Sequence, residues 1–206
     1  MAHQVIWRIE GKAETVAEIE RSLAGLGAEI GRTPGFVRSR FFQRREEPAQ
    51  FCWLTEWGRR AEGEAASFRA ADGLVEIAEF LVEPATRCTL EFLWEYGVQP
   101  GIVETTELVR LVMAQEAVEP SLAVLRQAAQ SIVGRFGIVS LSVNRCVERP
   151  VHLYVVQELE RRDAANELMG APERRQWLGE VCDALVDPPH RYRLKSPGWP
   201  NSATRV

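Results

Sequence analysis

Apolar residues along the first half of the chain follow two spacings, one typical of strands and the other of helices. A short apolar run at residues 5–9, bounded by Gly11, predicts a strand. Apolar side chains then recur at helical spacing over 13–31, and a Thr-Pro-Gly turn ends this helix. The same reasoning predicts three more strands, at 36–43, 51–57 and 86–96. It also predicts a second helix at 61–81, which Pro84 ends.

The second half of the chain repeats this pattern 102 positions later without a gap through its middle. Gly35 falls on Gly137, and Glu56 falls on Glu158. Self-similarity between two domain-sized stretches predicts a duplicated domain. The elements predicted for the second copy are a strand at 107–113, a helix through 118–132, strands at 138–145 and 151–159, a helix carrying Trp177, Val181 and Leu185, and a last strand at 190–195.

The order β-α-β-β-α-β is that of a ferredoxin-like unit, so the chain is predicted to be an α+β protein. We expect one domain at 1–98, a second at 103–195 and an irregular tail at 196–206. A ferredoxin-like sheet has helices on one face, and its other apolar face must be buried. We therefore expect the two sheets to pack face to face as an intramolecular barrel, giving either a monomer with pseudo-twofold symmetry or a chain that also forms a homodimer.

The composition narrows the choice of partners. The net charge of −4 over 206 residues offers no global field for nucleic acid or an anionic membrane. No apolar run approaches the roughly 18–20 residues of a membrane span, and we expect a cytoplasmic protein. The four cysteines lack metal-site or disulfide spacing, so we expect four separate reduced core thiols and no metal.

The stretch from Thr33 to Leu81 resembles the antibiotic biosynthesis monooxygenase family, which belongs to the dimeric α+β barrel superfamily. The resemblance rests on Thr33-Pro34-Gly35-Phe36, on an aromatic strand ending in Leu54-Thr55-Glu56-Trp57, and on Phe68-Arg69. It extends over both copies. It implies an oxygenase of an aromatic polyketide-type or phenolic substrate in antibiotic or secondary-metabolite biosynthesis. It also implies that dioxygen is the co-substrate, with no metal or haem, and that reduced flavin is the alternative to a cofactor-free reaction.

The resemblance also assigns the aromatic residues of the predicted pocket. Strand alternation places Phe51, Trp53, Thr55 and Trp57 on one face. The family's pocket tryptophan falls on Trp57, and Trp53 stands where the anthrone-type oxygenases have an asparagine. With Phe68, these side chains are predicted to bind the substrate. The alternative for both tryptophans is ordinary core packing.

Three arginines complete the predicted site. Arg8 lies in mid-strand among apolar residues and needs a partner. That partner is either a carboxylate, at Glu10, Glu56 or Glu158, or the enolate of a substrate, in which case Arg8 is catalytic together with Trp57. Arg38 and Arg40 either line the cavity or face solvent.

Several chemistries lack sequence support. No histidine occurs between Gly58 and Arg87, where the haem-degrading relatives carry their haem ligand. Phosphate-binding glycine loops, nucleophile elbows and zinc-protease motifs are also missing. The alternatives to an oxygenase are a polyketide cyclase or isomerase with the same fold, and a non-catalytic binding protein.

Overall fold

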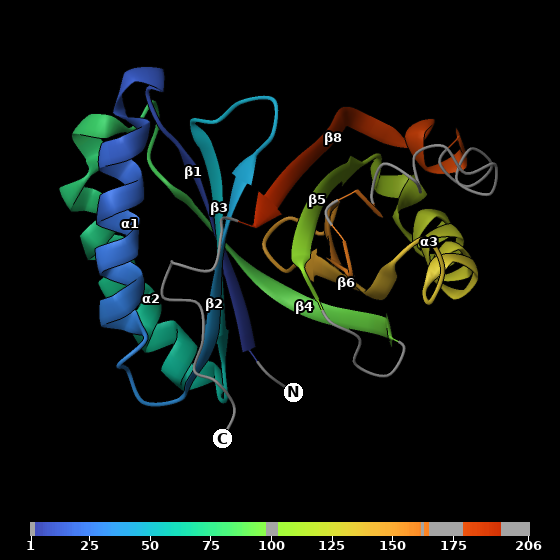
Figure 1. Cartoon of the computed structure of the whole chain (residues 1–206), viewed down its shortest axis with the longest axis horizontal. Coiled ribbons are helices and arrows are strands. Elements are labelled where there is room, and N and C mark those ends of the chain that lie inside the picture. The colour runs from blue at the N-terminus through green and yellow to red at the C-terminus, as the bar shows by residue number, and fades with distance from the viewer. Residues whose placement is uncertain (1–2, 98–102, 162, 165–178, 195–206) are drawn as a thin grey trace. The chain divides into compact units, whose positions relative to one another are not determined.

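The computed structural model describes residues 3–97, 103–161, 163–164 and 179–194. The chain divides into two compact units, unit 1 (Met1–Glu91 with Leu194–Val206) and unit 2 (Phe92–Arg193). Both units combine helices with an antiparallel sheet, which confirms the α+β prediction (Figure 1). The predicted linker at 98–102 and the tail at 196–206 lie outside the described residues, so the predicted domain limits and the sheet-to-sheet packing stay predictions.

Unit 1 has the predicted ferredoxin-like order. Its elements are β1 (His3–Glu10), the 3₁₀ turn η1 (Ala13–Thr15), α1 (Val16–Ile30), β2 (Phe36–Arg44), β3 (Gln50–Trp57), α2 (Arg60–Glu76), η2 (Ala78–Phe80) and β4 (Thr86–Gly97), whose last residues belong to unit 2. β1 pairs with both β3 and β4, and β3 also pairs with β2, all antiparallel. Both helices lie on the same face of this sheet (Figure 1).

The two helices of unit 1 pack on the sheet in different ways. α1 buries large apolar side chains at helical spacing, namely Ile19, Leu23 and Ile30. α2 instead buries small residues such as Gly63 and Ala66. A Cβ at Gly63 would overlap the ring of His3 and approach Trp57, so α2 lies very close to the sheet.

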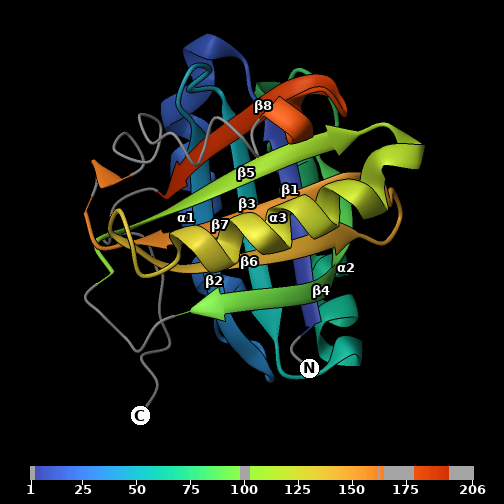
Figure 2. The ribbon, with the colours of Figure 1, turned by 90° about the vertical axis from the view of Figure 1, so that its right-hand side faces the viewer.

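Unit 2 repeats the order as far as the structure describes it. Its elements are β5 (Thr105–Met113), η3 (Gln115–Ala117), α3 (Val118–Ile132), β6 (Ile138–Cys146), β7 (His152–Leu159) and β8 (Leu185–Leu194). β5 lies between β7 and β8, and β7 also pairs with β6. α3 packs on this sheet through a separate core cluster that includes Leu125, Ile132 and Val143 (Figure 2).

The entry to the second strand has the same geometry in both units. Gly35 and Gly137 have positive φ, of 78° and 70°. In each unit, the carbonyl of this glycine accepts a hydrogen bond from the backbone N–H of the residue that follows the third strand. Gly58 donates to Gly35 at 2.8 Å, and Glu160 donates to Gly137 at 2.9 Å. A register shift follows at once in both strand pairs. The sequence match between these glycines therefore reflects a backbone conformation that favours glycine.

One predicted element of the second copy is wrong in part. Val181 is helical as expected, but Leu185 lies in β8 and not in the helix. Leu185 follows Val181 at helical spacing, yet Pro188 and Pro189 exclude a helix here because they lack the backbone N–H. The pairing of β8 with β5 is irregular at this point. Trp177 lies outside the described residues.

Among the helices that the structure describes, none is both long and apolar enough to cross a membrane.

Candidate functional site

The aromatic side chains of β3 lie on the face that the helices cover. Phe51, Trp53 and Trp57 belong to one core cluster with Ile19 of α1 and Leu74 of α2. All three aromatic side chains are almost completely buried. Strand alternation grouped them correctly, and their surroundings are those of ordinary core packing.

One hydrogen bond and one aromatic contact fix the position of the Trp57 side chain. Its indole Nε1 donates to Thr55 Oγ1 at 3.0 Å, and Phe36 meets its ring edge-on with centroids 5.5 Å apart. The Thr55 hydroxyl lies in turn 3.3 Å from the carbonyl oxygen of Val5. Thr55 is therefore occupied by internal hydrogen bonds.

Trp53 differs from Trp57 in its polar atom. Its ring stacks on Phe41 at an interplanar angle of 10°, with centroids 5.1 Å apart. Within the described part of the chain, no acceptor bonds its buried Nε1. A buried donor without an acceptor is costly, which makes it a group available to an oxygen atom of a ligand.

Phe68 does not join these residues. It lies on the outer face of α2 with 74% of its surface exposed. The structure therefore does not place it in a pocket with Trp53 or Trp57.

The opposite face of the sheet in unit 1 carries a buried carboxylate. Glu56 pairs with Arg38 Nε at 2.7 Å and with Arg40 Nη2 at 3.1 Å. It also accepts a hydrogen bond from Gln4 Nε2 at 3.0 Å. Arg38 and Arg40 are thus held in an ion-pair network, the arrangement that a buried charge requires.

Arg8 lies on this second face too, because β1 pairs it with Cys52 of β3 and Thr86 of β4. Glu56 is engaged by Arg38 and Arg40, and no ion pair links Arg8 to any described residue. Arg8 and Trp57 consequently lie on opposite faces of one sheet. The structure does not assemble the predicted aromatic residues and arginines into a single pocket.

An apolar pocket of about 340 Å³ does open on the helix-covered face of unit 1. It lies between the C-terminal half of α2 and the segment 78–85 that precedes β4. Trp7 of β1 forms one wall, and the remaining lining residues are Ala71, Leu74, Val75, Ala78, Leu81, Val82, Glu83, Pro84 and Ala85. Its volume falls at the lower end of the range for small-molecule sites.

Trp7 connects this pocket to the aromatic core. In the sheet, it lies directly opposite Trp53 on one side and Arg87 on the other. Directly opposite residues of paired strands share a face, so Arg87 is a cation beside the pocket wall. Sequence reasoning missed both residues. Trp7 alternates with Ile6 and Arg8 and could have been placed, but the position of Arg87 depends on the pairing of β4 with β1.

Further charged groups gather near the first turn of α2. The hydrogen bond from Arg60 lowers the pKa of the exposed Glu64 carboxylate, and the charges of His3 and Arg87 act in the same direction. His3, which pairs with Trp57 in the sheet, is buried beneath Gly63. A histidine and an arginine thus lie on the same face as the aromatic core.

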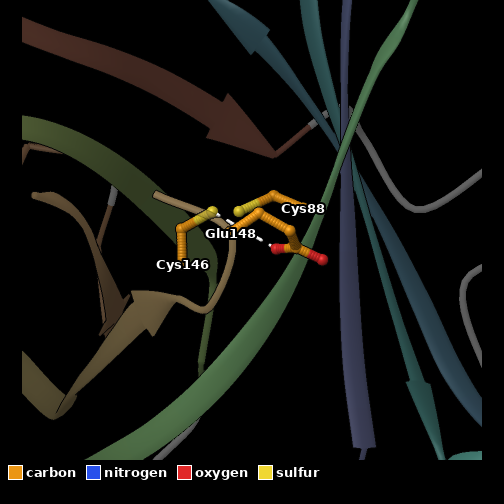
Figure 3. A group of neighbouring side chains, drawn as sticks. All are labelled: Cys88, Cys146 and Glu148. Carbon is orange, nitrogen blue, oxygen red and sulfur yellow. Dashed lines mark hydrogen bonds between the residues drawn. The ribbon is translucent and has the colours of Figure 1, made fainter. Parts of the chain in front are cut away.

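The cysteines correct the expectation of four reduced core thiols. Cys52 is a buried free thiol, but Cys182 is a free thiol on the surface. Cys88 and Cys146 are disulfide-bonded. Figure 3 shows both with Glu148, whose Oε2 lies 3.5 Å from the Cys146 sulfur. Neither bonded sulfur can act as a thiolate ligand.

No protein-family model matches the chain, and no curated protein is similar to it in sequence. Solved structures are similar over almost its whole length. An anthrone oxidase-like protein is 12% identical, with a TM-score of 0.72 over 95% of this chain and 92% of that protein. A "putative monooxygenase" from Fusobacterium nucleatum is 7% identical, with a TM-score of 0.72 over 98% and 97%.

A third structure comes from Listeria monocytogenes and is described as an uncharacterised ferredoxin-fold protein related to antibiotic biosynthesis monooxygenases. It is 9% identical to this chain, with a TM-score of 0.52 over 95% of this chain and 96% of that protein. Likeness at such low identity concerns the fold and does not fix the reaction. The chain therefore has the fold of the antibiotic biosynthesis monooxygenase-like proteins.

Proposed function

We propose that this protein is an oxygenase that binds a flat aromatic or phenolic substrate in the apolar pocket of unit 1. The observation that carries the proposal is this pocket, because it is walled by an indole and has a guanidinium on the same sheet face. The shared fold with monooxygenase-like proteins supports the reaction type.

The reaction needs little from the protein beyond binding and charge. An anthrone-type CH₂ group reacts with O₂ to give C=O and H₂O, so the carbon loses four electrons and dioxygen gains them. No external reductant is required for this balance. We therefore propose a reaction without metal or haem, with dioxygen and the aromatic substrate as partners, and keep reduced flavin as the alternative for substrates that are harder to oxidise.

Two groups would favour the substrate anion that reduces dioxygen. Arg87, beside Trp7, would stabilise a phenolate or enolate oxygen by charge. The indole N–H of Trp53 would donate to a substrate oxygen that reached the core. Trp7 would provide the stacking surface, as aromatic rings do in pockets for flat ligands.

The roles predicted for Trp57 and Arg8 change accordingly. Trp57 would not contact the substrate but would stabilise the core beside the pocket, through its hydrogen bond to Thr55 and its packing. Arg8, on the other face of the sheet, would not contact the same substrate molecule. A role for Arg8 would require a second ligand.

The test is oxygen uptake by the full chain with an anthrone or a related phenol. Ala71 lines the pocket and is only partly buried, so Ala71→Phe should fill the pocket and abolish turnover while the protein stays folded. Ala65→Phe is the matched control, because Ala65 is exposed on the same helix and does not line the pocket. Equal loss in both variants, or full activity in Ala71→Phe, would remove the pocket from the reaction.

A non-catalytic binding protein is the second candidate. It is supported by the burial of Trp53 and Trp57 in the core cluster of unit 1, where neither is exposed for catalysis. Substrate binding without oxygen uptake or product would support this candidate. Product formation without oxygen uptake would support a cyclase or isomerase.

A further inference from the structure

Unit 2 carries a groove of about 460 Å³ between α3 and the strands β4 and β6. Leu93 and Trp94 of β4 contribute apolar surface, together with Leu122 of α3. Figure 2 shows α3 running along β6, with β4 beside them. The polar lining consists of Glu119, Arg126, Gln127, Gln130 and Arg145.

The first cation of the groove has no acidic partner. The guanidinium of Arg126 lies 5.7 Å from the centre of the Trp94 ring, a cation–π contact. In the part of the chain that the structure describes, no carboxylate forms an ion pair with Arg126. Its charge is therefore available to an anion.

The second cation already holds a carboxylate. Arg145 Nη1 donates to Glu119 Oε1 at 3.1 Å. The Glu119 side chain is 77% exposed, and exposed pairs of this kind contribute only about 0–1 kcal/mol. Glu119 thus shows that a carboxylate fits at Arg145. Because this pair is weak, the carboxylate of a ligand that binds more tightly could displace Glu119.

The ring of Trp94 is held in place before any ligand arrives. Tyr96 meets it edge-on with centroids 5.5 Å apart, and the Tyr96 hydroxyl accepts a hydrogen bond from Gln130 at 2.9 Å. With Arg126 on the ring, Trp94 has neighbours that fix its orientation. A preorganised aromatic surface reduces the entropy lost on binding.

The fold does not require these charges. The equivalent helix of unit 1, α1, begins and ends 102 residues earlier, and it carries Ala24 where α3 carries Arg126. The counterpart of Arg145 in unit 1 is Gln43 of β2, and the counterpart of Glu119 is Ala17 of α1. Unit 1 forms its helix and sheet without them, so the two arginines are not needed to form a unit of this fold.

We propose that this groove binds a small carboxylate with a flat apolar body. The ring lies against Trp94 and Leu122, and the carboxylate lies between Arg126 and Arg145 in place of Glu119. An inorganic anion would use the arginines alone and leave the partly buried apolar side chains of Leu93 and Leu122 uncovered. The proposal is independent of the proposed reaction, because no groove residue lines the pocket of unit 1.

The test is calorimetric titration of the full chain with 2-naphthoate. Arg126→Gln and Arg145→Gln should each weaken binding about tenfold or more, since each removes a charge-assisted hydrogen bond. The neutral isostere 2-naphthamide should bind as poorly as those variants bind naphthoate. Arg149→Gln is the matched control, because Arg149 is an exposed arginine of unit 2 outside the groove, and its affinity should equal that of the wild type.

Two further measurements sharpen the outcome. Glu119→Gln should raise the affinity for naphthoate several-fold, because it removes the competing carboxylate. Inorganic phosphate and acetate should bind more weakly than naphthoate. Equal binding of naphthoate and naphthamide, equal affinity in wild type and both groove-arginine variants, or no naphthoate binding at all would overturn the proposal.

Discussion

The side chains of β3 alternate between two buried environments that differ in chemistry. Trp53 and Trp57 face the helices and pack within the core, and Trp57 also donates a hydrogen bond to Thr55. Glu56, one residue before Trp57, faces the other way and holds two arginines. A substitution in this strand therefore tests packing or charge according to the parity of its position.

Trp57→Ala should cost stability before anything else. Loss of a buried tryptophan leaves a cavity, so we expect the free energy of unfolding to fall by about 3–5 kcal/mol. Trp57→Phe keeps most of the apolar surface but loses the hydrogen bond to Thr55, and should cost about 1–2 kcal/mol. Urea denaturation measures both. A stability of Trp57→Ala close to the wild type would show that Trp57 faces a ligand pocket and not the core.

Replacing Arg40 should cost more stability than replacing Arg38, although both arginines pair with Glu56. The Arg40 side chain is 11% exposed and the Arg38 side chain 44% exposed. Removing Arg40 leaves the buried carboxylate short of its inner partner, so Arg40→Ala should lower the free energy of unfolding by about 3 kcal/mol. Arg38→Ala should cost about 1 kcal/mol or less, because solvent screens that pair.

Urea denaturation at low and high salt distinguishes the two pairs. Salt should reduce the effect of Arg38→Ala and leave that of Arg40→Ala nearly unchanged, because buried pairs are screened less. Arg149→Ala serves as the exposed control. Similar losses for Arg38 and Arg40 would mean that the Glu56 network is uniformly solvated.

At the scale of elements, the turn before the second strand controls how each sheet starts. Gly35 and Gly137 adopt a left-handed conformation, and each is followed by a shift in the register of the strand pair. The turn thus sets which residues of β2 and β6 face the helices.

Gly35→Ala and Gly137→Ala should both destabilise the protein, by about 1–2 kcal/mol each, because a Cβ is strained at positive φ. At Gly35 the new Cβ would also displace the Glu62 carboxylate. Gly25→Ala is the control: Gly25 lies in α1 with open space around it, and alanine there should stabilise by about 0.5–1 kcal/mol. Thermal unfolding of the three variants provides the comparison, and an unchanged Tm for Gly35→Ala would contradict the strain argument.

The sequence predicted most elements, but it could not predict which side chains of different strands lie near one another, for a physical reason. Helical and strand spacing located α1, β2 and β3 to within about three residues, because each combines a clear period with a turn at its end. Alternation also sorted the β3 side chains into two sets. Alternation cannot say which set the helices cover, so it left both a pocket and core packing open for the tryptophans. Arg87 was missed because its neighbour Trp7 is distant in sequence.

At the scale of the whole molecule, two units have separate apolar cores. One cluster joins the helices and sheet of unit 1, and the other joins α3 to the sheet of unit 2. The apolar pocket belongs to the first unit and the charged groove to the second. Each unit therefore combines a core with its own candidate site.

Separate cores predict that local damage stays in its own unit. In hydrogen exchange followed by mass spectrometry, Gly35→Ala should raise exchange mainly in peptides of β2 and β3. Gly137→Ala should raise it mainly in peptides of β6 and β7, since each turn contacts its own sheet. Equal acceleration throughout the chain in both variants would show that the units open together.

The repeated elements also bear on how such a protein can evolve. When a protein assembles from identical subunits, every mutation in the gene alters all copies of a site at once. Here the counterpart of Arg126 is Ala24, so the two matching helices carry different residues at this position. In one polypeptide that carries both halves, a mutation in one half leaves the matching position of the other unchanged, so the two halves can come to bind different ligands.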